Sequence, residues 1–228
     1  MCQHDGVSTA HRVPCIAVAA FATSTLLAGP VPYASATSCP DVEVVFARGT
    51  KEPPGVGGIG QAFVDSMRSA VGDRSFDVYA VNYPASTDFP TAIEGVADAS
   101  AHIERMATEC PATRLVLGGF SQGAAVMGFV TADEVPAGIA ASQVPKPMPP
   151  SVADHVAAVA LFGKPSDKFM RAIDEPSVVV GPRYAGKTID LCISNDPICS
   201  GSGEGYAHGL YAVNGMVGEA AAYAANRL

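Results

Sequence analysis

Residues 113–130 read Thr-Arg-Leu-Val-Leu-Gly-Gly-Phe-Ser-Gln-Gly-Ala-Ala-Val-Met-Gly-Phe-Val, and this stretch decides the fold. Its first six residues predict a short buried strand, and residues 124–130 predict a buried helix. Between them lies Gly119-Phe120-Ser121-Gln122-Gly123. A strand, a Gly-x-Ser-x-Gly turn and a helix in this order form a nucleophile elbow, in which a strained serine exposes its hydroxyl. Ser121 is therefore the candidate nucleophile.

The turn also has a simpler explanation, because any tight strand-to-helix connection needs small residues. Glycine accounts for 23 of the 228 residues, so chance can place two glycines around a serine in this chain. A short motif of this kind needs support from its structural context. The rest of the sequence must supply the partners that a nucleophilic serine requires.

Apolar segments alternate between strand-like and helix-like patterns along the chain. The predicted strands cover residues 41–47, 77–83, 113–118, 155–162 and 188–193, and the predicted helices cover residues 59–71, 91–109, 124–130 and 210–227. This alternation predicts an α/β fold, a three-layer sandwich around a mainly parallel sheet, with a site at the carboxyl ends of the strands. Leu210 and Val213 are expected on the buried face of the last helix. Prolines lead us to expect irregular structure in residues 136–150 and 166–186.

A serine hydroxyl needs a base to remove its proton, and in α/β-hydrolases the base follows the nucleophile and the acid in the sequence. Only His155 and His208 follow Ser121. His155 begins a predicted strand, at the far end of the sheet from Ser121. His208 lies in a glycine-rich loop before the last helix, on the Ser121 side, and is the predicted base. The alternative is a loop histidine that caps the helix.

The acid must lie between Ser121 and His208. The candidates are Asp133, Glu134, Asp154, Asp167, Asp174, Glu175, Asp190, Asp196 and Glu204. Asp196 directly follows the fifth predicted strand, in a loop that a Cys192–Cys199 disulfide would hold in place, and it is the predicted acid. An Asx turn before Pro197 is the alternative explanation for this aspartate.

The remaining requirement is a pair of donors for the oxyanion. In such an elbow, the residue after the nucleophile supplies one backbone N–H, which here is Gln122. The loop after the first strand, Arg48-Gly49-Thr50, is placed to supply the other. Thr50 is the predicted donor, through its N–H and its hydroxyl.

The first 36 residues have the pattern of a secretory signal peptide. An apolar run from Val13 to Ala28 precedes Ala34-Ser35-Ala36, a typical cleavage site, so we expect a single mature domain over residues 37–228. A lipid-anchored Cys39 is the less favoured alternative. The 14 Lys and Arg residues are scattered and the net charge is −8, so nothing indicates nucleic-acid binding.

Four cysteines remain after such a leader, and an even number is typical of an exported protein. Three pairings are possible. The short separation of Cys192 and Cys199 favours their pairing, which leaves Cys39 with Cys110. The alternative is a metal site, but the spacing is not that of a zinc module and no histidine lies near the cysteine pairs.

Taken in order, four segments resemble the cutinase family. Residues 46–52 resemble its A-R-G-[ST]-x-E segment, residues 119–123 its G-Y-S-Q-G, residues 192–199 its C-x-x-x-D-x-[IV]-C, and residues 208–211 its H-x-x-Y. The resemblance implies a small, lidless serine esterase with a five-stranded sheet and the disulfides Cys39–Cys110 and Cys192–Cys199.

The expected activity is hydrolysis of short- to medium-chain acyl esters or lipids by Ser121, His208 and Asp196, with no metal or organic cofactor. We expect a secreted monomer that contacts lipid or cell-wall surfaces transiently. Two alternatives remain, which are an acetyl-polysaccharide esterase and a secreted binding protein with an inactive triad. The chain contains no tryptophan, the aromatic side chain best suited to stacking on sugar rings, which disfavours the acetyl-polysaccharide esterase.

Overall fold

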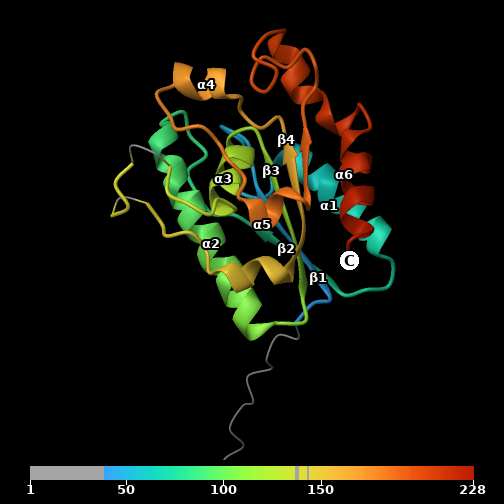
Figure 1. The fold of residues 1–228 in the computed structure, drawn as a ribbon. Coiled ribbons are helices and arrows are strands. Elements are labelled where there is room, and N and C mark those ends of the chain that lie inside the picture. The colour runs from blue at the N-terminus through green and yellow to red at the C-terminus, as the bar shows by residue number, and fades with distance from the viewer. Residues whose placement is uncertain (1–38, 137–138, 143) are drawn as a thin grey trace, which may run out of the picture. The chain divides into compact units, whose positions relative to one another are not determined.

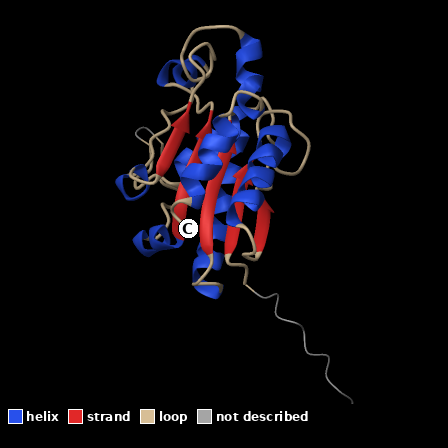
Figure 2. Ribbon diagram, turned by 90° about the vertical axis from the view of Figure 1, so that its right-hand side faces the viewer, coloured by secondary structure: helices blue, strands red, loops and turns tan. Residues whose placement is uncertain are grey.

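The computed structural model describes residues 39–136, 139–142 and 144–228. The expected signal peptide, residues 1–36, lies outside these residues. The described strands are β1 (Val42–Ala47), β2 (Phe76–Ala80), β3 (Arg114–Phe120), β4 (Val156–Phe162) and β5 (Thr188–Leu191). They form one sheet in the order β2-β1-β3-β4-β5, in which every neighbouring pair is parallel (Figure 2).

Helices cover both faces of this sheet. The α-helices are α1 (Gly57–Val71), α2 (Ala92–Glu109), α3 (Gln122–Val130), α4 (Asp167–Ala172), α5 (Pro182–Ala185) and α6 (Met216–Ala225). Three 3₁₀ helices, η1 (Phe89–Thr91), η2 (Pro150–His155) and η3 (Gly205–Ala212), lie between them. Helices α1 and α6 pack on one face, and α2 and α3 pack on the other (Figure 1). The predicted three-layer α/β fold is confirmed.

The central strands are buried on both sides, as parallel strands between helices must be. Alternate residues of β1 illustrate this, because Val44 and Phe46 pack against α1 while Val45 and Ala47 belong to the opposite core with α2 and α3. All four side chains have no exposed surface. The largely apolar run in the sequence therefore reflects two cores that share one sheet.

The register of the sheet brings the carboxyl ends of three strands together. Ala47 of β1 pairs with Gly119 of β3, and Phe120 of β3 pairs with Phe162 of β4. The residues that follow, Ser121 among them, therefore emerge at one edge of the sheet. This is the edge where ligands bind in open α/β sheets.

The expectation that residues 166–186 are irregular is wrong in part. The segment contains α4, which begins where the Ser166 hydroxyl accepts a hydrogen bond from the N–H of Phe169 at 3.4 Å. It also contains α5, where Pro182 occupies the first turn. Proline fits that position because the N–H it lacks would have no helical partner there.

The prediction of one closing helix over residues 210–227 is also wrong. The chain forms η3 first and enters α6 only after Gly215, whose φ of 92° is unfavourable for other residues. Leu210 and Val213 are not buried as expected, and Val213 is 79% exposed. The helical pattern of apolar residues therefore spans two separate elements.

The second strand ends at Ala80, three residues earlier than predicted, and carbonyl groups beyond it accept from Arg48. The guanidinium of this buried arginine donates to the carbonyl oxygens of Val81 and Tyr83, at 3.3 and 2.5 Å. The contacts hold the chain beside the loop that follows β1.

Disulfides join Cys39 to Cys110 and Cys192 to Cys199, with Cα–Cα distances of 5.4 and 5.8 Å. In the described part of the chain, no helix combines the length and the apolar character that crossing a membrane requires.

Candidate active site

Ser121 lies in a strained turn between β3 and α3. Its φ and ψ of 54° and −118° are unusual for a residue with a side chain. A Cβ atom on Gly119 would lie 2.2 Å from the carbonyl oxygen of Gly123, and one on Gly123 would lie 1.9 Å from that of Ala47. Both glycines of the motif are therefore required by close backbone contacts.

His208 connects Ser121 to Asp196. Its Nε2 lies 2.7 Å from the Ser121 hydroxyl oxygen, and its Nδ1 lies 2.7 Å from Oδ2 of Asp196. An ionised carboxylate only accepts hydrogen bonds, so Nδ1 carries the proton and Nε2 accepts from the serine. This is the arrangement in which a histidine can remove the serine proton.

The carboxylate of Asp196 is completely buried and has three hydrogen-bond donors. Oδ1 accepts a 2.9 Å hydrogen bond from the N–H of Ile198, and Oδ2 accepts a 2.6 Å bond from the Tyr211 hydroxyl in addition to that from His208. The loop that carries Asp196 is closed by the Cys192–Cys199 disulfide. The carboxylate is therefore fixed in position before any substrate binds.

Two further residues shape the space around the imidazole. The ring of Phe120 stacks on that of His208, with ring centres 4.8 Å apart. Gly163, directly after β4, has a φ of 59°, and a Cβ there would lie about 3 Å from His208, Tyr211 and Asp196. A side chain at position 163 would displace the histidine.

A network of hydrogen bonds shapes the loop after β1. One carboxylate oxygen of Glu52 accepts from the N–H of Gly49 at 2.6 Å, and the other accepts from the N–H of Gly58 at 2.7 Å. A Cβ on Gly57 would lie 2.2 Å from this carboxylate, which explains part of the glycine-rich segment before α1. Arg48 closes the loop by donating to the carbonyl oxygen of Glu52 at 2.9 Å.

This loop places Thr50 beside Gln122. The Thr50 hydroxyl donates to the side-chain oxygen of Gln122 at 3.4 Å, and the Gln122 amide donates to the carbonyl oxygen of Ser86 at 3.1 Å. Gln122 begins α3, where backbone N–H groups have no partner within the helix. Among the described residues, no carbonyl accepts from the N–H of Thr50 or Gln122.

A cavity of about 280 Å³ opens at Ser121, and we call it the site cavity. Thr50, Gln122 and His208 line it at the polar end. Most of the remaining wall is apolar and comes from Phe89, Ala92, Ala125, Phe129, Pro165, Phe169, Met170, Ile173 and Ile198. The cavity therefore suits a ligand with one polar group and an apolar remainder.

The structure brings together all five residues that the sequence predicted for the site, and it separates the alternatives. His155 ends η2 and places its Nδ1 3.2 Å from the carbonyl oxygen of Pro111. Asp190 is partly exposed and lies 3.3 Å from the ammonium group of Lys164. The sequence interpretation missed Gly163 and the apolar wall from α4. The motif that contains Glu52 does not indicate its hydrogen bonds to the loop, and the short α4 has no clear apolar pattern.

The described ranges of the chain contain no cluster of three or more His, Cys, Asp or Glu side chains that could hold a metal ion.

Comparison with known proteins identifies the family to which the chain belongs. Residues 38–228 match the family model described as Cutinase. The chain is 58% identical to "Probable carboxylesterase Culp5" of Mycobacterium tuberculosis over 73% of this chain and 95% of the relative. It is 50% identical to "Phospholipase Culp4" of the same organism, over 99% of this chain and 97% of the relative.

A solved structure of Trichoderma reesei cutinase with a phosphonate inhibitor is similar at a TM-score of 0.62 and 33% identity, over 82% of this chain and 76% of that one. The segment that matches the family model, residues 38–228, contains the elbow, the loop after β1 and the disulfide-closed loop described above. The chain therefore belongs to the cutinase family of carboxylic ester hydrolases.

Proposed function

We propose that Ser121, His208 and Asp196 hydrolyse carboxylic esters through an acyl-enzyme intermediate. The observation that carries this proposal is the pair of 2.7 Å contacts that link the serine hydroxyl to the imidazole and the imidazole to a buried carboxylate. Each contact has the length expected for a working triad.

In the first half of the reaction, Nε2 of His208 takes the Ser121 proton while the serine oxygen bonds to the ester carbonyl carbon. Asp196 orients the imidazole and stabilises its charged form. The N–H groups of Thr50 and Gln122 donate to the oxyanion. His208 then passes the proton to the alkoxide as the ester bond breaks, and the alcohol leaves. A water molecule repeats these steps on the acyl-enzyme and releases the acid.

The apolar wall of the site cavity supports an acyl ester or a lipid as the substrate. It argues against an acetylated polysaccharide, whose sugar rings need polar partners. The relatives named as a carboxylesterase and a phospholipase are consistent with this range. The substrate class we propose is therefore esters of apolar acyl chains.

Exposed apolar side chains near His208 support contact with a lipid surface. Tyr206 is 69% exposed, Leu210 37% and Val213 79%, and all three lie in or just after η3, which carries His208. Such a group on and beside the 3₁₀ helix that carries His208 is suited to reversible contact with a lipid layer. The two disulfides support export to an oxidising compartment, where we propose that the protein acts as a monomer.

The test is the Ser121→Ala variant, measured with p-nitrophenyl butyrate. Its kcat should fall at least about 10³-fold while its circular dichroism spectrum is unchanged. Ser69→Ala, on the exposed side of α1, is the matched control and should keep full activity. Ester turnover retained by pure, folded Ser121→Ala would contradict the proposal.

Labelling with a fluorophosphonate separates an enzyme from a binding protein of the same fold. The wild-type chain should gain one label, and the Ser121→Ala variant should gain none. A wild-type protein that is folded but takes no label would favour the binding protein.

A further inference from the structure

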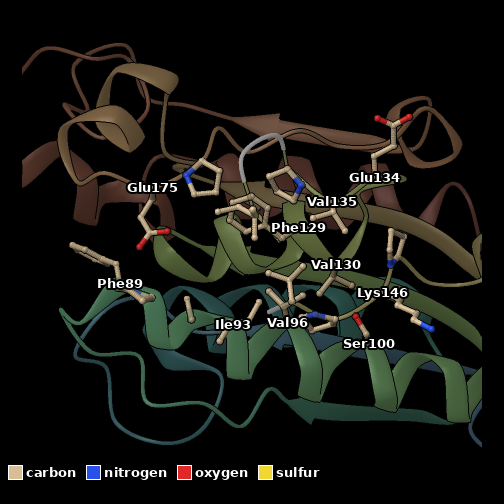
Figure 3. A pocket seen from close by; sticks show the side chains of 18 residues that line it. Phe89, Ile93, Val96, Ser100, Phe129, Val130, Glu134, Val135, Lys146 and Glu175 are labelled. Carbon is tan, nitrogen blue, oxygen red and sulfur yellow. The ribbon is translucent and has the colours of Figure 1, made fainter. Parts of the chain in front are cut away.

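A second apolar cavity lies beside the site cavity, between α2, α3 and residues 144–147. It has a volume of about 270 Å³, and we call it the trough. Figure 3 shows Phe89 and Glu175 at one end of it and Ser100 and Lys146 at the other, with Ile93, Val96 and Val130 between them. The triad residues do not line the trough, so the reaction described above gives it no role.

The trough begins where the site cavity ends. Phe89, Ala92, Phe129 and Glu175 line both cavities. The two spaces are therefore neighbours that share a wall of four residues. A ligand that fills the site cavity and extends along Phe89 and Ala92 is directed toward the trough.

Two helices line the space that leads from the nucleophile toward the trough. Ser121, Ala125 and Phe129 follow one another at intervals of four and so lie on one side of α3, which lines the site cavity. Ala92, Val96 and Ser100 repeat this interval on α2 and line the trough. Each path is about 12 Å long, which is the reach of roughly ten bonds of an extended chain.

We propose that the trough receives the far end of a long, unbranched acyl chain whose ester carbonyl lies at Ser121. The proposal rests on the function proposed above and narrows its substrate class to esters with acyl chains longer than about ten carbons. Shorter chains end inside the site cavity.

The chemistry of the path suits methylene groups. Its walls are mainly aliphatic and aromatic, and each methylene removed from water strengthens binding roughly three- to fourfold. Glu175 stands at the junction of the two cavities, where burial raises its pKa above the usual value. This carboxyl group is therefore protonated, and so neutral, more easily than an exposed carboxyl group would be. A neutral group is the better neighbour for an apolar chain. Ser100, Glu134 and Lys146 make the far end polar and limit its apolar length.

The test fills the trough and leaves the site cavity open. Ile93 lines the trough but not the site cavity and is only partly buried, so Ile93→Trp adds bulk where it is needed. Ala97→Trp, on the exposed side of the same helix, is the matched control. The chain has no tryptophan, so each variant contains a single indole whose emission reports its surroundings. Blue-shifted emission in Ile93→Trp alone establishes that its trough is filled.

The measurement is kcat/KM for p-nitrophenyl esters from butyrate to palmitate. In Ile93→Trp the value for palmitate should fall at least about tenfold, while that for butyrate stays within about twofold of wild type. Ala97→Trp should change neither value. Ile93→Ser is a second variant, which makes the trough more polar without adding bulk. It should lower kcat/KM only for the long-chain esters.

Three results would overturn the proposal. One is an equal loss for butyrate and palmitate in folded Ile93→Trp, and another is no loss for palmitate. The third is a loss confined to a two-chain glycerolipid, which would assign the trough to a second acyl chain. A wild-type protein inactive on butyrate would instead refute the proposed function, so the two failures are distinguishable.

Discussion

The hydroxyl group of Tyr211 donates a 2.6 Å hydrogen bond to Oδ2 of Asp196, the oxygen that also accepts from His208. Burial, and then this hydrogen bond, raise the pKa of Tyr211 above its usual value. The phenol therefore remains a donor throughout the neutral pH range. It holds the carboxylate away from solvent, because Tyr211 and Asp196 are both completely buried.

Replacing Tyr211 by Phe should lower kcat by about tenfold, because a hydrogen bond to a charged group contributes about 1.5–3 kcal/mol. The ring is kept, so its packing against Phe120 and Phe162 is preserved. The measurement is kcat with p-nitrophenyl butyrate. Tyr206→Phe removes an exposed hydroxyl from the same 3₁₀ helix and should leave kcat unchanged. Equal rates in the two variants would contradict a role for the Tyr211 hydroxyl.

Replacing Glu52 by Ala should lower kcat by about 10- to 100-fold with little change in KM. The carboxylate receives the N–H groups of Gly49 and Gly58 and so fixes the loop that carries Thr50. Loss of a well-placed oxyanion donor costs about 10²-fold in enzymes of this kind. Glu219→Ala, on the exposed side of α6, is the control for loss of a surface carboxylate. A variant in which only KM rises would place Glu52 in substrate binding instead.

Removing one disulfide should mainly lower stability, and removing the other should also lower activity. Removing Cys39–Cys110 opens the longer loop and should cost about 4 kcal/mol, against about 2.5 kcal/mol for Cys192–Cys199. Only the second pair restrains Asp196. The double variant Cys192→Ala/Cys199→Ala should therefore lose kcat well below its melting temperature, while Cys39→Ala/Cys110→Ala should keep kcat and show the lower Tm. Thermal melts and initial rates at 20 °C, taken on both variants, test this difference; equal rates would contradict it.

Replacing Gly123 by Ala should prevent stable folding or lower the Tm by about 10 °C or more, because the added methyl would overlap the backbone of β1. Gly186→Ala is the matched control, since a Cβ there meets nothing within 4 Å. Thermal denaturation followed by circular dichroism measures both. A Gly123→Ala variant as stable as Gly186→Ala would show that the elbow can relax.

The ionisation of Glu175 should make the protein less stable as the pH rises. Burial raises the pKa of this carboxyl above its ordinary value of 4.5. The folded state then holds the proton more tightly than the unfolded state, so the contribution favours folding at low pH and is lost as pH rises from 4.5 through the raised value. Glu175→Gln should match wild type at pH 4 and become the more stable of the two as pH rises to 7.

Urea unfolding of both proteins at pH 4, 5, 6 and 7 measures this difference in the free energy of unfolding. Asp77→Asn, an exposed carboxylate on β2, serves as the control for a change in net charge. A difference between Glu175→Gln and wild type that stays constant over the whole range would exclude a titration of Glu175.

Local sequence was sufficient for the elements whose cause is local. The elbow follows from two glycines that backbone contacts require, and the strands of the sheet follow from apolar runs such as that of β1. Asp196 and His208 were predicted as partners of Ser121 because a serine nucleophile needs a base and an acid, and because these follow the nucleophile in α/β-hydrolases. Their catalytic roles remain predictions, although the geometry suits them.

The predictions that failed concern segments whose structure depends on distant contacts. Periodicity joined η3 and α6 into one helix, since it does not register the left-handed turn at Gly215. Periodicity also missed α4, because this helix is short and its apolar side chains are buried by contacts with α3 and Val178. In both places the amino-acid pattern is compatible with more than one local structure.

The sequence by itself determined the fold class, the order of the elements and the residue types available for catalysis. These depend on backbone preferences and on residues that are neighbours in the sequence. Only the tertiary structure decided that Ser121 and His208, 87 residues apart, lie at hydrogen-bond distance. It alone decided that α2 and α3 enclose a trough next to the site cavity. Such distances arise from how the sheet and helices pack, and packing is a property of the whole chain.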